Sequence, residues 1–331
     1  MTDFTELVDL ASERVGGAAI VANDDFFASC ENLVKAAKPV WREGEYTDRG
    51  KWMDGWETRR RREPGHDWCV IRLGLAGRIA GVIVDTAFFV GNHPESCSLD
   101  GAVIEGRGDR DPFPTEAIGW SEILPRTPLQ GGTENRLPVL HAGRVTHVRL
   151  NIFPDGGVAR LRVYGLVLPD WERLEGAEDV DLAAIENGGR VVASSDMFFG
   201  SRHNLILPGP SRGMMDGWET RRRRGPGHDW AIVRLGAAGR IRRVEVDTTH
   251  FKGNAPGSCS IETVSVEGES DPLETDLPWK ELLPNTRLEP NRLHRFEREL
   301  SETVEATHAR LNIFPDGGVS RLRLFGRRSP A

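Results

Sequence analysis

The sequence predicts an all-β protein built from two tandem β-sandwich domains, and two observations carry this prediction. First, the chain repeats itself. "MDGWETRRRREPGHDWCVIRLG" from Met53 returns as "MDGWETRRRRGPGHDWAIVRLG" from Met215, and 22 of the 27 positions that begin there are identical. Second, each copy consists of short β-branched or aromatic runs separated by Gly, Pro, Asn and Asp, without alternating long helices. Many short strands with Gly/Pro turns are typical of sandwiches.

The repeat extends over nearly the whole chain. "VDLA" at Val8 returns at Val180, and "THVRLNIFPDGG" returns as "THARLNIFPDGG" near the end. The length of 331 residues suits two domains at roughly 150 residues each. We therefore expect domains at 1–168 and 169–331, joined within the polar, acidic segment "LPDWERLEGAED". The first copy alone carries an insertion, within residues 34–51.

Each domain has expected elements of its own. In the first copy, "WCVIRLG", "IAGVIVDTAFF", "SCSLDGAVIEG", "HVRLNIFP" and "ARLRVYG" are predicted strands. The "DGG" after "NIFP" predicts a tight turn that joins the last two strands as a hairpin. A short amphipathic helix is expected at the start of each domain, because apolar residues at helical spacing precede a Gly-Gly pair: Phe4, Leu7, Val8 and Ala11, then Gly16 and Gly17.

Composition and charge exclude several classes of partner. The chain is 28% charged and 38% hydrophobic, with a net charge of −7, which argues against a surface for nucleic acid. Its apolar stretches are shorter than the about 20 residues that a membrane helix needs. The N-terminal stretch is acidic and lacks the basic start and apolar run of a signal peptide. We expect a cytoplasmic protein without nucleic-acid or membrane partners.

The cysteines predict reduced thiols. None of Cys30, Cys69, Cys97 and Cys259 forms a CxxC pair, and only the last two occupy matching repeat positions. Neither a disulfide framework nor a structural zinc site is expected from this pattern.

The charged block is the first candidate site. It is shared between the copies, whereas the stretch from Phe88 to Val145 has diverged from its counterpart. Glu57, Arg59 and Arg61 alternate, so a strand would place them on one side. Guanidinium groups beside a carboxylate suit a small, planar anion. A ladder of ion pairs is the structural alternative.

The "PGHDW" loop supplies a second candidate. His66 titrates near neutrality and could act as an acid or base. His66 and Asp67 are adjacent, so in an extended chain they point apart and form no dyad. A metal role for His66 is a further alternative, although no HxH or HxxxH spacing supports it.

Other repeated polar residues have structural interpretations. Asp85 and Asp247 follow apolar strands, and each is either buried with hydrogen-bond partners or placed at the mouth of the sandwich. His147 and His308 lie within predicted strands, where packing is the simpler role.

Together the motifs resemble the allantoicase family. The resemblance rests on "GKWMDGWETRRRR.PGHDW", "DDFF..CENL", "VDT.FF.GN.P" and "RLNIFPDGG", where dots are variable positions. It implies hydrolysis of allantoate to ureidoglycolate and urea, in purine breakdown through allantoin. It also implies a tandem pair of galactose-binding-like jelly rolls. "DW.VIRLG..GRI..V.VDT" is similar to discoidin-type modules, so a non-catalytic carbohydrate-binding protein is the alternative.

Allantoate carries a carboxylate and two ureido groups on one carbon. The charged and polar residues shared by the two copies can be given roles in binding these groups and in breaking the carbon–nitrogen bond. The expected catalytic residues are Glu57, His66 and Asp67, with Glu219, His228 and Asp229 in the second copy. The expected substrate-binding residues are Arg59, Arg61 and Asn92, with Arg221, Arg223 and Asn254. No cofactor is predicted, a divalent metal stays open, and a homo-oligomer is expected. Because Phe88 faces His250 and Val90 faces Lys252, we expect the two copies to be unequal in catalysis.

Overall fold

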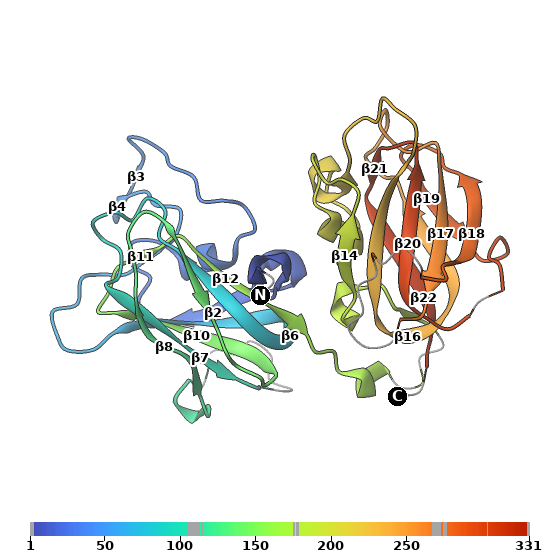
Figure 1. Cartoon of the computed structure of the whole chain (residues 1–331). Helices are drawn as coiled ribbons and strands as arrows, with labels where there is room; N and C mark the ends of the chain where they lie inside the picture. Colours follow the sequence, from blue (N-terminus) through green and yellow to red (C-terminus); the bar gives the residue numbers. More distant parts are fainter. Residues whose placement is uncertain are drawn as a thin grey trace. The chain divides into compact units, whose positions relative to one another are not determined.

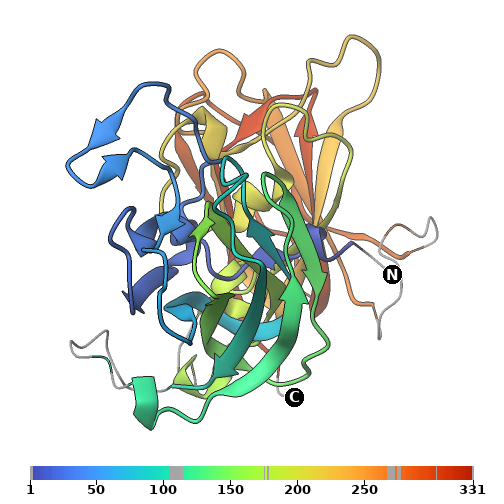
Figure 2. The same cartoon turned by 90° about the vertical axis from the view of Figure 1, so that its left-hand side faces the viewer.

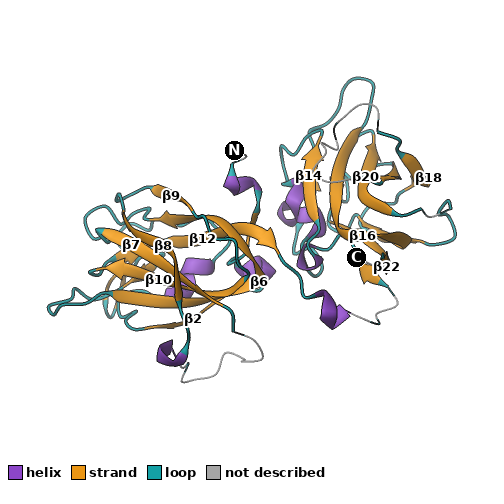
Figure 3. Ribbon diagram, turned by 60° about the horizontal axis from the view of Figure 1, so that its bottom comes forward, coloured by secondary structure: helices purple, strands orange, loops and turns teal. Residues whose placement is uncertain are grey.

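The computed structural model describes residues 3–104, 113, 115–174, 176, 179–266, 273, 277–302 and 304–329. The chain divides into two compact units, Met1–Leu168 and Pro169–Ala331. In each unit strands dominate and the helices are short 3-10 turns (Figures 1 and 3). No helix in these described ranges is long and apolar enough to cross a membrane. The all-β class and the tandem repeat are confirmed.

The first unit is an eight-stranded sheet with two small two-stranded ladders. The sheet has the order β1-β12-β6-β10-β7-β8, and β2 and β9 also pair with β6. The strands are β1 (Val8–Asp9), β2 (Ala18–Ala22), β3 (Tyr46–Thr47), β4 (Gly50–Lys51), β5 (Trp56–Glu57), β6 (Asp67–Asp85), β7 (Ser96–Ala102), β8 (Ser121–Pro128), β9 (Glu134–Pro138), β10 (Val145–Phe153), β11 (Gly157–Val158) and β12 (Arg160–Val167). The turns are η1 (Phe4–Glu6), η2 (Glu13–Val15), η3 (Cys30–Val34) and η4 (Thr115–Ala117).

The second unit repeats this topology, with the order β13-β22-β16-β20-β17-β18 and with β14 and β19 on β16. Its strands are β13 (Val180–Asp181), β14 (Arg190–Ser194), β15 (Trp218–Glu219), β16 (Asp229–Asp247), β17 (Ser258–Val264), β18 (Lys280–Arg287), β19 (Leu293–Phe296), β20 (Ala306–Phe314), β21 (Gly318–Val319) and β22 (Arg321–Arg328). Its turns are η5 (Trp171–Leu174), η6 (Ile185–Asn187), η7 (Arg202–Ile206) and η8 (Met214–Asp216).

The long strand β6 organises the first unit and overturns the predicted hairpin. Its first part pairs with β10 and its second part with β12, so these two strands flank different stretches of β6 and do not pair with each other. The "DGG" connection between them serves another purpose. Gly157 pairs with Glu57, and the Thr58 N–H donates to the Gly156 carbonyl. The connection therefore anchors β5, the strand that carries the candidate site.

The predicted N-terminal amphipathic helix is also wrong. The segment forms η1, the short strand β1 and η2. The Asp9 carboxylate accepts hydrogen bonds from the N–H groups of Ala11 and Val163, and Val8 pairs with Gly165 of β12. These bonds hold the segment extended against β12. Pairing with the sheet is favoured because an isolated helix of this length has little stability of its own. The left-handed Gly16 ends η2.

Part of the repeated block belongs to the core. Trp56 is fully buried, and its Nε1 donates to the Asp24 carbonyl. A Cβ on Gly55 would lie 2.7 Å from Phe89, so only glycine fits beneath that ring. The buried Asp54 pairs with Arg160 at 2.8 Å. The "DGW" part of the repeat is thus explained by packing.

Candidate functional site

Glu57 lies at the end of β5 in the first unit. Asn92 Nδ2 donates to its Oε1 at 2.7 Å. Burial raises the pKa of the Glu57 carboxyl, and the bond from Asn92 opposes that rise only in part. In the second unit Asn254 donates to Glu219 at 2.5 Å. A catalytic candidate and a substrate-binding candidate therefore contact each other in both units, although this pairing was not predicted from the sequence.

Arg59 follows Glu57 by two residues and presents an exposed guanidinium group. Thr58 is buried and bonds to Gly156, so its neighbours Glu57 and Arg59 project away from the core. Arg59 Nε donates to Asp24 at 2.8 Å, while the Arg59 side chain stays 62% exposed. Bonds from Arg59 and from the Phe26 N–H outweigh burial and lower the pKa of Asp24. Asp24 thus fixes one edge of the guanidinium and leaves the outer nitrogens accessible.

Arg61 turns inward instead. Its guanidinium donates to the buried Asp67 at 2.8 Å, and Asn23 donates to the same carboxylate oxygen at 2.9 Å. Arg223 and Asp229 make the equivalent pair at 2.5 Å in the second unit. Arg61 and Arg223 therefore form structural ion pairs, which was the alternative to binding an anion. We call Glu57, Arg59, Asn92 and Asp24 the loop-end site.

His66 has a different set of partners. Its ring lies 4.7 Å from that of Phe153. Burial, together with the charge of Arg149, lowers the pKa of His66 although Asn151 hydrogen-bonds to it. As predicted, His66 and Asp67 point apart, since Asp67 bonds to Arg61 and Asn23. His66 directly precedes β6 and packs against Phe153 of β10, and the described hydrogen bonds join it to none of the loop-end residues.

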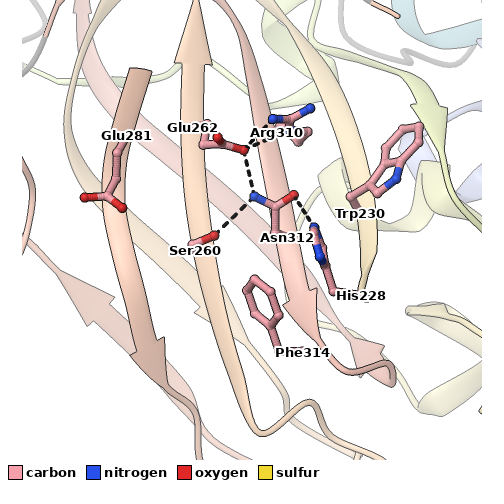
Figure 4. A pocket seen from close by; sticks show the side chains of 8 residues that line it. All are labelled: His228, Trp230, Ser260, Glu262, Glu281, Arg310, Asn312 and Phe314. Atoms are coloured by element: carbon pink, nitrogen blue, oxygen red, sulfur yellow. Dashed lines mark hydrogen bonds and ion pairs between the residues drawn. The ribbon is translucent and has the colours of Figure 1, made fainter. Parts of the chain in front are cut away.

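The same sheet region of the second unit contains a pocket of about 390 Å³. We call it the sheet-face pocket, and Figure 4 shows its lining residues: His228, Trp230, Ser260, Glu262, Glu281, Arg310, Asn312 and Phe314. Sequence reasoning named only His228 among them. The signal was present, because alternate residues of "RLNIF" share one face of a strand, and this motif is repeated in both copies.

The insertion of the first copy lies beside the loop-end site. Its β3–β4 hairpin stands apart from the strands of the sandwich (Figure 2). The ring of Trp41 lies 5.7 Å from that of Phe88, and Lys51 Nζ lies 3.9 Å above Trp41. Phe88 has a φ of 69°. Its counterpart His250 instead bonds to the Ser211 carbonyl at 3.0 Å. The two units therefore differ just beside Asn92 and Asn254.

The remaining polar candidates have structural roles. Asp85 is buried and its Oδ1 accepts a bond from the Ala87 N–H, and Asp247 accepts the equivalent bond from Thr249. His147 and His308 are buried within their strands. The first of the two alternatives is therefore correct for Asp85, whereas Asp247 keeps the hydrogen bond but is only half-buried.

All four cysteines are free and buried. In the described part of the chain, no three His, Cys, Asp or Glu side chains are grouped so that they could hold a metal ion. Metal dependence stays a prediction.

Comparison with known proteins agrees with the motifs. A family model described as the allantoicase repeat matches residues 8–168 and 180–329. A probable allantoicase of Pseudomonas aeruginosa is 52% identical over 98% of this chain and 96% of the relative, and one of Photobacterium profundum is 49% identical over 99% and 98%. The crystal structure of allantoicase from Saccharomyces cerevisiae superposes with a TM-score of 0.81, at 36% identity over 97% of this chain and 93% of that one. The chain belongs to the allantoicase family.

Proposed function

We propose that this protein hydrolyses allantoate to ureidoglycolate and urea, and that the loop-end site of the first unit is the reaction centre. Family membership along nearly the whole chain supports the reaction. One observation supports this choice of reaction centre. Glu57, a half-buried carboxyl group with a raised pKa, precedes the exposed guanidinium of Arg59 by two residues.

Glu57 can supply the proton that urea loss requires. A carbon–nitrogen bond of allantoate breaks, its electron pair leaves with the urea nitrogen, and that nitrogen must be protonated. The raised pKa keeps more of Glu57 protonated for this donation. The lone pair of the remaining ureido nitrogen forms a double bond to the carbon, which gives an iminium that keeps its N–H. The Glu57 carboxylate then takes a proton from the water that adds to the iminium carbon, which regenerates the acid. The two steps together consume one water and release one urea.

Arg59 can hold the substrate carboxylate. Asp24 orients its guanidinium through Nε, so the two terminal nitrogens remain for a two-pronged bond to an anion. Asn92 fixes one oxygen of Glu57, which directs the other oxygen toward the bound molecule. In this proposal Arg61 and Asp67 position the loop between the reaction centre and β6.

The first unit is the better candidate for turnover. Its insertion places Trp41 against Phe88 and a lysine ammonium above Trp41. These groups add an apolar surface and a positive charge at Phe88, which precedes Asn92 in the same loop, and such a surface suits a bound anion. The second copy lacks the insertion.

The proposal also covers the oligomeric state of the protein, its location in the cell and its partners. We expect a cytoplasmic homo-oligomer that binds no nucleic acid, and a divalent metal stays open. Exposed apolar side chains support an interface between copies, with Phe198 64%, Phe199 54% and Met215 82% exposed. The net charge of −7 disfavours nucleic acid. Light scattering with size exclusion reports the oligomeric state.

Urea release from allantoate tests the function. The purified protein should release urea at a rate proportional to its concentration, and the assay is run with and without EDTA. Abolition by EDTA and recovery with Mn²⁺ or Zn²⁺ would confirm the reaction and show that it depends on a divalent metal. A folded preparation that releases no urea under any of these conditions would refute the proposal, and binding to a glycan array would then favour the carbohydrate-binding alternative.

A further inference from the structure

The sheet-face pocket of the second unit is built from a connected hydrogen-bond network. Glu262 accepts from Arg310 Nε at 2.8 Å and from Asn312 Nδ2 at 2.9 Å. Asn312 Nδ2 also donates to Ser260 Oγ at 3.1 Å. These side chains come from the neighbouring strands β17 and β20 (Figure 4), so the floor of the pocket is held in one geometry.

This network determines which atoms can accept from a ligand. A carboxylate only accepts, so the Asn312 amide must turn its NH₂ toward Glu262. Its Oδ1 then faces His228 Nε2, at 3.2 Å, and that nitrogen must donate. The other ring nitrogen of a neutral His228, Nδ1, is consequently an acceptor. Two carboxyl groups, Glu262 and Glu281, add further acceptors to the lining.

The charge of the pocket disfavours an anion. Arg310 is the one arginine or lysine among the described residues that line the pocket. Its guanidinium is held between Glu262, at 2.7 Å, and the ring of Trp279, at 4.6 Å. The exposed Glu281 adds a negative charge. Trp230 and Phe314 provide flat apolar walls, which suit a planar molecule.

We propose that the sheet-face pocket binds a small molecule that carries no negative charge, through a planar group that donates N–H bonds, with a ureido group as this recognised part. The choice of a ureido group among planar N–H donors rests on the proposed function. The site itself does not, because its residues lie outside the loop-end site and belong to another unit.

The first unit offers an internal control. Its network is the same, since Arg149 pairs with Asp100 at 2.8 Å and Asn151 donates to Ser98 and Asp100. However, the guanidinium of Arg126 lies 4.3 Å over the ring of Phe153, the counterpart of Phe314. Arg126 therefore covers the ring of Phe153, whereas the ring of Phe314 lines the sheet-face pocket of the second unit.

An exposed asparagine, Asn285, stands at the position of Arg126 in the second unit, because Thr127 pairs with Cys97 as Thr286 pairs with Cys259. Asn285→Arg should consequently cover Phe314 without disturbing the network. Since Asn285 is exposed, the substitution should leave the melting temperature and the urea release from allantoate unchanged.

Binding is measured on the full-length protein labelled with ¹⁵N-tryptophan. The indole signal of Trp230, assigned through Trp230→Phe, is followed during titration with allantoin, an uncharged compound with one ureido group. We expect a saturable shift in the wild type and at least about tenfold weaker binding in Asn285→Arg. Arg126→Asn should give the indole of Trp68 a comparable new response.

The contrary outcomes are distinct. No saturable shift of Trp230, an equal shift in Asn285→Arg, or a shift caused by galactose and not by allantoin would each overturn the proposal. Loss of urea release in Asn285→Arg would also overturn it, because the pocket would then belong to the reaction centre. If the wild type released no urea but Trp230 still responded to allantoin, only the proposed function would fail.

Discussion

Glu57 and His308 both have pKa values shifted by burial, one upward and one downward. We expect Glu57 to affect the pH dependence of activity and His308 to affect the pH dependence of stability. Burial raises the pKa of Glu57 above its ordinary value. In its proposed role as an acid, Glu57 must be protonated in the free enzyme. We predict that the limb of kcat/KM that falls with rising pH reports Glu57, and that Asn92→Ala moves it to higher pH, because the Asn92 bond favours the carboxylate. A limb unmoved by Asn92→Ala would contradict the acid role.

His308 controls stability rather than turnover. Burial, together with Arg234 and Arg190, lowers the pKa of His308 to about 4. The unfolded chain, with a histidine pKa near 6.5, therefore binds more protons between these values. We predict that stability is lost as pH falls from about 6.5 through about 4. His308→Gln should flatten this part of a melting-temperature profile, and an equally steep profile would refute the assignment.

Among the elements, the insertion of the first copy is the one that sequence comparison singled out and the structure places beside the site. We predict that Trp41→Ala raises the KM for allantoate by roughly 2- to 10-fold, which corresponds to an aromatic contact of about 0.5–1.5 kcal/mol. The melting temperature should change little, since Trp41 is 44% exposed. Tyr46→Ala is the matched control, because Tyr46 is 72% exposed on the same insertion. Equal effects of both changes would contradict a role for Trp41.

The strands and the repeat could be predicted from the sequence, but the pairing of some elements could not. The strands and the repeat were predictable because strand periodicity and duplication are local signals. The hairpin after "NIFP" was not, because the two strands it joins pair with different parts of β6, a long-range choice that the turn residues do not record. The N-terminal helix failed for the same reason, since Asp9 and β12 hold that segment extended.

The site was predictable by residue type and only in part by arrangement. Glu57 and Asn92 do meet, although they lie far apart in the sequence. The alternation of Glu57, Arg59 and Arg61 suggested one shared face, but β5 ends at Glu57. Arg61 then turns to the buried Asp67 while Arg59 stays exposed. The partners that decide this, Asp24 and Asn23, come from a separate stretch of the chain.

At the scale of the whole molecule, duplication provides two units with the same framework and different surroundings. Trp56 and Trp218 are equally buried, and Asp54–Arg160 has its counterpart in Asp216–Arg321. The contact of Trp41 with Phe88 occurs in the first unit only. Arg126 covers the ring of Phe153 in the first unit, whereas the counterpart ring of Phe314 lines the sheet-face pocket of the second unit. We infer that the first unit carries out turnover and that the second unit binds a ligand.

The most direct test of this account compares kcat for urea release in two matched variants, Glu57→Gln and Glu219→Gln. Removing a catalytic acid typically costs a factor of roughly 10² to 10⁴, so Glu57→Gln should lose about that much with its melting temperature retained, because a neutral amide avoids the cost of burying a charge. Glu219→Gln should keep most of the activity. Equal, roughly twofold losses in both variants would mean two equivalent sites, and full activity in Glu57→Gln would contradict the loop-end site as the reaction centre.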